Sequence, residues 1–246
     1  MVHSILIIGQ SNMAGRGVIE QAPPLKNQSR LFVARNCKWV NLFRPINPDR
    51  SFSGVCLAET FADLYVEDHD VSVGIIPCAD GGTTLEQWMP NGVLFENAVN
   101  CAKLCQRDST LVAILWHQGE SDSTSEQLKQ VYSEKLKILF DELRARLGKD
   151  IPIVIGELGE YLKDHGKFPF FEDINKDLKN YAETTDKVAF ASAKGLKDKG
   201  DILHFDTPSL IEFGTRYYNA FKTIENVELT KNVSDHTISI SEIEKL

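Results

Sequence analysis

The chain has 246 residues, 42% of them hydrophobic, and a formal net charge of -8. This length lies within the range of one α/β domain, and the hydrophobic content is sufficient for a core that needs no disulfides. No basic cluster stands out, so the composition argues against a nucleic-acid or anionic-membrane partner. The five cysteines are an odd number, which is not typical of a disulfide framework, and we interpret them as buried structural thiols.

The first apolar run, residues 5–8, is too short to span a membrane. No charged segment or cleavage pattern of a signal peptide accompanies it. We therefore expect a cytoplasmic protein.

Short apolar runs alternate with longer amphipathic stretches along the chain. The predicted strands are residues 3–9, 31–34, 71–77, 110–116, 151–156 and 187–192. The predicted helices are residues 55–66, 93–106, 126–147, 172–183 and 209–223. Most strands are continuous runs of Val, Ile and Leu, which is typical of strands covered on both faces. The alternation therefore favours a doubly wound parallel sheet with helices on both sides.

We expect one domain over residues 1–226, because no repeat, low-complexity segment or linker interrupts them. The remaining residues 227–246 are polar and strand-like in places, as at residues 237–240. They are interpreted as an extension that forms either an added hairpin or a loose tail.

Polar, glycine-containing segments follow four of the predicted strands. They are Gly9-Gln10-Ser11-Asn12-Met13, Cys78-Ala79-Asp80-Gly81-Gly82-Thr83, His117-Gln118-Gly119-Glu120-Ser121-Asp122 and a loop that reaches Asp201-Ile202-Leu203-His204-Phe205-Asp206. Ligands of open parallel sheets bind beyond the carboxyl ends of the strands. We therefore expect these four segments to meet at one rim of the sheet.

Ser11 is the candidate nucleophile. A serine hydroxyl attacks poorly until a base removes its proton, and His204 is the candidate base. Asp201, three residues before His204, is close enough to hold the imidazole in one tautomer. Hydroxyl, imidazole and carboxylate are together the groups that acyl transfer needs.

The tetrahedral intermediate of acyl transfer also needs hydrogen-bond donors at its oxyanion. The N–H of Ser11 and an N–H near Gly81 or Gly82 are candidates, because glycine lets the backbone approach a substrate closely. The side-chain amide of Gln118 is a third candidate.

The four segments, in this order and spacing, resemble the sialate O-acetylesterase and carbohydrate esterase family 6 branch of the SGNH hydrolases. The resemblance extends from the first strand to the last helix and implies a flavodoxin-like, three-layer α/β/α fold. It also implies removal of O-linked acetyl groups from sugars, as in acetylxylan esterases. The residues on the family's triad positions are Ser11, Asp201 and His204, and those on its oxyanion positions are Ser11, Gly81, Gly82 and Gln118. Gln118 takes the place of an asparagine in the wider family.

Several residues near this rim have more than one interpretation. Glu120 is a second candidate for the carboxylate that orients His204, although we favour Asp201. Arg16 is a candidate substrate contact or part of an ion pair that fixes the loop. Trp88 is a candidate surface for a sugar ring, and His117 is either a substrate contact or a buried histidine.

Other functions remain open beside the acetylesterase. Sialate 9-O-acetylesterase activity and broad hydrolysis of small esters fit the same residues, and an inactive carbohydrate-binding protein would keep the fold alone. Metal-assisted hydrolysis is disfavoured, because the His-x-x-Glu pair lacks the His-x-x-x-His spacing of zinc proteases. We expect no cofactor and no metal, and the partner we expect is an acetylated carbohydrate substrate.

Overall fold

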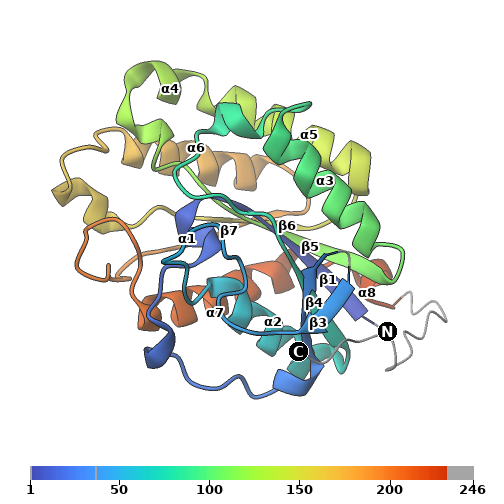
Figure 1. The fold of residues 1–246 in the computed structure, drawn as a ribbon. Helices are drawn as coiled ribbons and strands as arrows, with labels where there is room; N and C mark the ends of the chain where they lie inside the picture. Colours follow the sequence, from blue (N-terminus) through green and yellow to red (C-terminus); the bar gives the residue numbers. More distant parts are fainter. Residues whose placement is uncertain (1, 37, 232–246) are drawn as a thin grey trace.

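A seven-stranded sheet forms the centre of the computed structural model, which describes residues 2–36 and 38–231 (Figure 1). Its strands are β1 (Val2–Gly9), β2 (Leu31–Arg35), β3 (Lys38–Asn41), β4 (Ser72–Pro77), β5 (Ser109–His117), β6 (Ile153–Gly156) and β7 (Val188–Ala191). Their order across the sheet is β3-β2-β4-β1-β5-β6-β7. All neighbouring strands are parallel except β2 and β3, which pair antiparallel at one edge.

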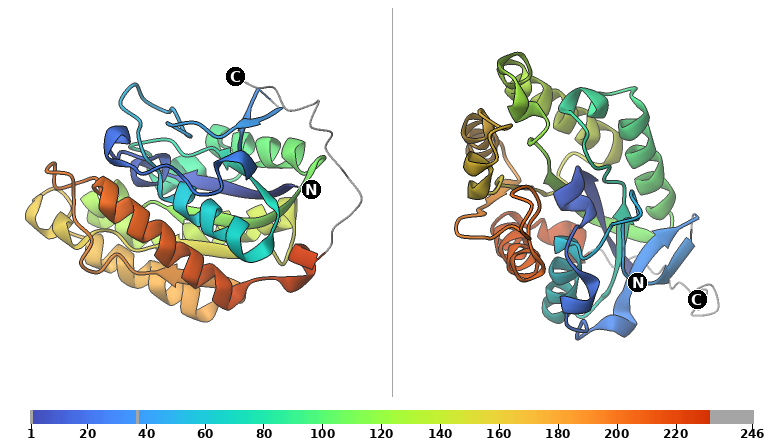
Figure 2. Two further views of the ribbon diagram at one scale, coloured as in Figure 1. Left: turned by 90° about the horizontal axis from the view of Figure 1, so that it is seen from below. Right: turned by 60° about the vertical axis from the view of Figure 1, so that its left-hand side comes forward.

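Helices cover both faces of the sheet, as Figures 1 and 2 show. They are α1 (Ser11–Ala14), α2 (Leu57–His69), α3 (Val93–Cys105), α4 (Glu126–Gln130), α5 (Tyr132–Leu147), α6 (Phe171–Thr184), α7 (Thr207–Ile224) and α8 (Val227–Lys231). One apolar layer joins the sheet to α3, α5 and α6, and a second joins it to α2 and α7. The predicted three-layer α/β/α fold is therefore confirmed. Within the described ranges, no helix combines the length and apolar character needed to cross a membrane.

Three elements differ from the sequence-based expectation. The predicted helix over residues 126–147 is divided into α4 and α5, which meet at Val131. Strand β3 was not predicted, because only its two middle residues are buried and the apolar run is correspondingly short. Residues 227–231 form the short helix α8 and not a hairpin strand, while residues 237–240 lie outside the described residues.

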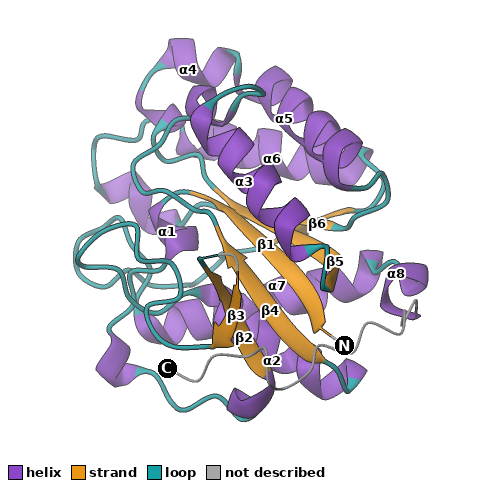
Figure 3. Cartoon of the chain, turned by 45° about the vertical axis from the view of Figure 1, so that its right-hand side comes forward, coloured by secondary structure: helices purple, strands orange, loops and turns teal. Residues whose placement is uncertain are grey.

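The centre of the sheet positions the predicted functional segments. All eight residues of β1 are buried, and its neighbours are β4 and β5, so the connections diverge on either side of it. Such a switch point is where ligands bind in open α/β sheets. Gly9 ends β1 with φ +127°, and a Cβ there would lie 2.2 Å from the carbonyl oxygen of His117. Glycine thus lets the end of β1 lie directly against the end of β5, and the loops gather there around α1 (Figure 3).

Candidate active site

Ser11, His204 and Asp201 are joined by two hydrogen bonds at the carboxyl end of β1. The Nε2 atom of His204 lies 3.0 Å from Ser11 Oγ, and its Nδ1 atom lies 2.7 Å from Asp201 Oδ2. An ionised carboxylate only accepts hydrogen bonds, so Nδ1 carries the proton and Nε2 presents a lone pair to the serine hydroxyl. The structure thus brings together three residues that the sequence predicted to meet, in the tautomer that general-base chemistry requires.

A tight turn fixes Asp201 beside His204. Asp201 Oδ1 accepts the backbone N–H groups of Leu203, at 3.0 Å, and of His204, at 2.8 Å. Between them, Ile202 has φ +58°, a left-handed conformation that a β-branched residue rarely adopts. Burial raises the pKa of Asp201, but hydrogen bonds from the backbone and ring of His204 outweigh it and leave that pKa below its usual range. The carboxylate is therefore ionised at neutral pH.

Ser11 is the first residue of α1. The helix is preceded by Gln10 at the N-cap position, and the Ser11 hydroxyl turns to His204 instead of capping the helix. The N–H of Ser11 donates no hydrogen bond to any group in the described part of the chain. Hydroxyl and N–H of one residue are thus both available at the pocket that Ser11 lines.

Asn12 connects α1 to the loop that carries His204. Its Nδ2 donates to Leu203 O at 3.1 Å and to Glu120 Oε1 at 2.6 Å, and its Oδ1 accepts the N–H of Phe205 at 3.1 Å. These bonds hold the residues on both sides of His204. Sequence reasoning gave Asn12 no role, although it stands directly after the nucleophile candidate.

Glu120 is bound to Asn12 and not to His204. It is 1% exposed, and its Oε2 has no hydrogen-bond partner among the described residues. The Nδ1 atom of His204, which an orienting acid must contact, is already bonded to Asp201. Geometry therefore favours Asp201 over Glu120 as the acid beside His204.

His117 is fully buried behind Glu120. Its Nε2 donates to the carbonyl oxygen of Glu157 at 3.1 Å, and its Nδ1 lies 3.7 Å from Glu120 Oε1. The side chain does not line the pocket at Ser11. The candidate role of His117 as a substrate contact is therefore wrong, and its alternative interpretation as a buried histidine holds.

Three backbone N–H groups at the pocket, those of Ser11, Gly81 and Gly82, are candidate oxyanion donors. The N–H of Gly81 is occupied, since it donates to Asp49 Oδ2 at 2.9 Å. The N–H of Gly82, like that of Ser11, donates to no acceptor in residues 2–36 and 38–231. A Cβ on Gly81 would lie 3.4 Å from Ser11 Cβ, so the glycine pair adjoins the hydroxyl. Ser11 and Gly82 are thus the pair with donors to offer.

The side-chain amide of Gln118 has no free N–H to add to the donors of Ser11 and Gly82. Its side chain is fully buried, and its amide donates to the carbonyl oxygen of Thr83 at 3.0 Å and to a carboxylate oxygen of Asp122. An amide nitrogen has only two hydrogens, so none is left for a substrate. The prediction that the Gln118 amide binds an oxyanion is therefore wrong.

Arg16 and Asp49 form a buried ion pair beside the glycines. The guanidinium donates to both carboxylate oxygens, at 2.9 and 2.7 Å, in a bidentate arrangement. Burial raises the pKa of Asp49, but hydrogen bonds from Arg16, Ser53 and the N–H of Gly81 outweigh it and lower that pKa overall. The ion-pair interpretation of Arg16 is thus observed. Asp49 was not predicted, since it lies far along the irregular loop beyond the predicted strand 31–34 and after β3, which was itself not predicted.

These residues surround a pocket of about 270 Å³. Its lining residues are Gln10, Ser11, Arg16, Arg50, Phe52, Gly81, Gly82, Glu120, Ser121, Phe168, Leu203 and His204. Trp88 is absent from this lining: it is fully buried, donates from Nε1 to Thr83 Oγ1 at 3.0 Å, and packs edge-on against Trp116. The prediction that Trp88 contacts a sugar is therefore wrong.

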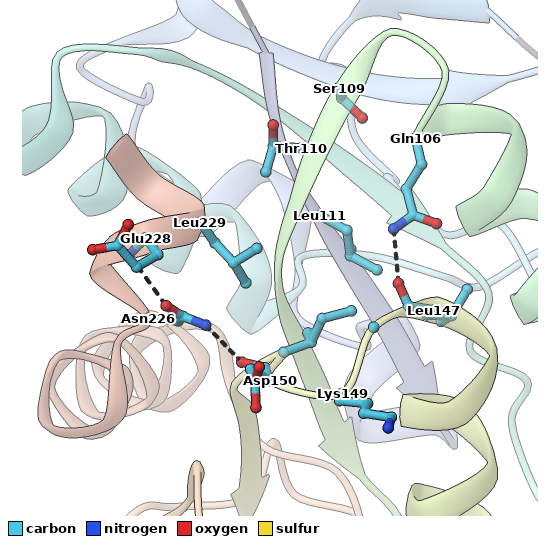
Figure 4. A pocket seen from close by; sticks show the side chains of 12 residues that line it. Gln106, Ser109, Thr110, Leu111, Leu147, Lys149, Asp150, Asn226, Glu228 and Leu229 are labelled. Atoms are coloured by element: carbon cyan, nitrogen blue, oxygen red, sulfur yellow. Dashed lines mark hydrogen bonds between the residues drawn. The ribbon is translucent and has the colours of Figure 1, made fainter. Parts of the chain in front are cut away.

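A second pocket, of about 480 Å³, lies at the opposite end of the sheet (Figure 4). It is framed by the start of β5, the end of α5 and α8, and includes Ser109, Asp150 and Asn226. The described residues that line it include no histidine to serve as a base. Among the described residues, no three His, Cys, Asp or Glu side chains converge as metal ligands. The smaller pocket at Ser11 is therefore the candidate active site.

The chain is similar in sequence and in fold to several known proteins. The Arabidopsis thaliana protein named probable carbohydrate esterase At4g34215 is 27% identical over 241 residues, covering 88% of each protein. The X-ray structure of that protein has a TM-score of 0.81 at 24% identity, covering 90% of this chain and 98% of that one. The crystal structure of NanS has a TM-score of 0.71 at 16% identity, covering 90% and 97% of the two chains. XAC1771, a carbohydrate acetylesterase from Xanthomonas citri, has a TM-score of 0.67 at 17% identity, covering 90% of this chain and 56% of that one.

These structural likenesses establish a shared fold, and the family follows from a separate comparison. A model of the family described as carbohydrate esterase, sialic acid-specific acetylesterase matches residues 2–223. The match spans every strand and the four segments at the rim of the sheet. The chain therefore belongs to this carbohydrate acetylesterase family, which confirms the resemblance found in the sequence.

Proposed function

We propose that the chain is a serine esterase that removes O-acetyl groups from sugars through an acyl-enzyme intermediate. Ser11 is the nucleophile, His204 the general base and acid, and Asp201 the carboxylate that holds the His204 ring. The observation that carries the proposal is the unbroken path of two hydrogen bonds, 3.0 and 2.7 Å long, from Ser11 Oγ through the imidazole to Asp201. Membership of a carbohydrate acetylesterase family supports the substrate class.

The first half of the reaction forms the acetyl-enzyme. As Ser11 Oγ attacks the acetyl carbonyl carbon, its proton moves to Nε2 of His204, and the imidazolium is stabilised by Asp201. The N–H groups of Ser11 and Gly82 donate to the oxyanion that develops on the carbonyl oxygen. The bond between the carbonyl carbon and the sugar oxygen then breaks, and Nε2 returns its proton to that oxygen.

The second half releases acetate. A water molecule attacks the acetyl-serine carbonyl and gives one proton to Nε2 of His204. The same two N–H groups stabilise the second tetrahedral intermediate. When it collapses, the bond to Ser11 Oγ breaks, and Oγ takes the proton back from Nε2, which restores the free enzyme.

The proposed substrates are acetylated xylan fragments and related oligosaccharides. A pocket of about 270 Å³ holds an acetyl group and only the nearest part of a saccharide, so the remaining sugar residues extend beyond its mouth. Acetate release from acetylated xylo-oligosaccharides, O-acetylated sialic acid and aryl acetates ranks these substrates against each other.

The test of the serine mechanism is Ser11→Ala. Removing the nucleophile should lower kcat for p-nitrophenyl acetate by about 10⁴-fold or more, with little change in Tm. The matched control is Ser133→Ala, which removes an exposed serine of helix α5 and should leave kcat unchanged. A fluorophosphonate should add its mass to the wild type at Ser11 and not to the Ser11→Ala protein. Full activity in Ser11→Ala would exclude the proposal.

A further inference from the structure

Phe52 is an exposed aromatic ring at the mouth of the candidate active site. Its side chain is 64% exposed, although phenylalanine is among the residue types most often buried. It belongs to neither of the two apolar layers of the described chain. It does line the same pocket as Ser11 and His204. Packing of the core therefore does not account for its position at the pocket mouth.

The loop that carries Phe52 is held in place without a ligand. The ring centroid lies 5.3 Å from the guanidinium carbon of Arg16, whose charge is itself fixed by the ion pair with Asp49. Ser53 Oγ donates to Asp49 at 2.7 Å, and the N–H of Gly54 donates to Gly15 O at 3.0 Å. The loop is thus tied to the segment that directly follows α1. Its aromatic ring has a fixed position relative to Ser11 before any substrate arrives, which lowers the cost of binding.

The chemistry of the pocket indicates what an exposed ring at this place would contact. Around Ser11 the wall offers hydrogen-bonding groups, among them Arg50 and Ser121, while Phe52 offers a flat apolar surface. A ligand that matches both has hydroxyl groups along its edge and a face of C–H groups. A pyranose ring has this shape, whereas a simple alkyl ester has no ring to place on the phenyl group.

We propose that Phe52 is the stacking surface for the sugar ring that carries the acetyl group, and thereby determines specificity for sugar esters over simple esters. The inference rests on the proposed esterase function and names a binding surface for its substrate. One side of the Phe52 ring lies on the Arg16 guanidinium, and the remaining exposed surface receives the C–H face of the sugar. Phe52 contributes to binding and orientation of the sugar, while the chemical step is left to Ser11 and His204.

The molecule contains a matched control for this ring. Phe43 is also exposed, at 41%, and its ring also lies over a guanidinium, with the carbon of Arg35 5.4 Å from the centroid. Phe43 does not line the pocket at Ser11. Truncation of Phe43 therefore reproduces the loss of an exposed phenyl group above an arginine without touching the candidate site.

The experiment compares a ring-bearing and a ringless ester in the full chain. Phe52→Ala should lower kcat/KM for glucose penta-acetate by about tenfold, mainly through KM, and change kcat/KM for ethyl acetate less than twofold. Phe52→Tyr keeps the ring and should retain the wild-type ratio between the two esters. Phe43→Ala should leave both values unchanged.

The outcomes separate this inference from the proposed function. If the wild type cleaves neither ester, the esterase proposal fails. A second outcome is that the wild type cleaves both esters, while Phe52→Ala lowers kcat/KM equally for both of them or for neither. In that case the stacking role of Phe52 is wrong and the esterase proposal stands. The stacking role of Phe52 would also be wrong if Phe43→Ala lost the preference for the sugar ester, because Phe43 lies outside the pocket.

Discussion

Two pairs of a carboxylate and an imidazole, each three residues apart in the sequence, lie on neighbouring loops of this molecule. In the first pair, Asp201 and His204 are 2.7 Å apart, and their side chains are 38% and 15% exposed. In the second pair, His117 and Glu120 are 3.7 Å apart, and their side chains are 0% and 2% exposed. The residue types and the spacing are alike, so the difference in burial decides what each pair can do.

The first pair is hydrogen-bonded to Ser11, and the second pair is not. His204 reaches both the pocket and Ser11, whereas burial lowers the pKa of His117 and its Nε2 is already bonded to a backbone carbonyl. Glu120 instead accepts a hydrogen bond from Asn12, which in turn holds the loop around His204. Glu120 is therefore linked to the loop around His204 through one asparagine side chain, and we propose that it is a positioning residue.

The difference between the two pairs is tested by neutralising each carboxylate in turn. In Asp201→Asn the amide can donate to Nδ1 and stabilise the wrong tautomer of His204, so kcat for p-nitrophenyl acetate should fall by about 10⁴-fold. In Glu120→Gln the amide oxygen can still accept from Asn12, so kcat should fall by less than about tenfold. Nearly full activity in Asp201→Asn together with an inactive Glu120→Gln protein would assign the orienting role to Glu120.

Asp49 offers a second comparison, because its carboxylate supports the site from a different loop. Asp49→Asn keeps an acceptor for the N–H of Gly81 but removes the charge opposite the buried Arg16. Because a neutral amide oxygen accepts a hydrogen bond more weakly than a carboxylate does, the backbone of Gly81 is held less firmly. We therefore expect kcat to fall by about tenfold, which is less than the loss of a whole oxyanion donor. A loss confined to KM would contradict a role for Asp49 in placing the oxyanion donors.

The same substitution should change how stability depends on pH. The folded-state pKa of Asp49 is lowered, so its contribution to folding is present above the ordinary aspartate pKa and is lost as pH falls through the folded value. At pH 7, Asp49→Asn should lower the free energy of unfolding by about 3 kcal/mol. That difference should shrink below about pH 4, as urea unfolding at both pH values would show. If the difference in the free energy of unfolding stayed constant with pH, the charge of Asp49 would not be the cause of its contribution to stability.

The sequence predicted the parts of the site that depend on the order of strands. Ser11 follows β1 and the glycine pair follows β4, and apolar runs mark those strands clearly enough to place their carboxyl ends together. The same argument brought the loop with Asp201 and His204 to this rim. Because parallel strands all end on one side, the meeting of these residues follows from the topology alone.

The remaining features depend on side-chain packing, which no pattern in the sequence indicated. Trp88 lies in a short 3-10 turn that directs the indole into the core beside Trp116, and its neighbours have no periodicity to show this. The Gln118 amide donates both of its hydrogens to acceptors on two different loops, Thr83 and Asp122. Phe52 and Asp49 lie well beyond the predicted strand 31–34. The unpredicted strand β3 intervenes, so the rule that places loops at strand ends did not indicate that these two residues lie near Ser11.

The smallest expected effect concerns the backbone between Asp201 and His204. Ile202 has φ +58°, and this conformation costs an ordinary L-residue about 1–2 kcal/mol. Asparagine tolerates it better, so Ile202→Asn should raise the free energy of unfolding by about 0.5–1 kcal/mol in urea titrations and leave kcat within about twofold. Ile202→Val keeps the branched Cβ and should show no such gain. Because the side chain is only 38% exposed, lost packing opposes the gain; a less stable Ile202→Asn would show that packing of Ile202 outweighs the strain of the turn.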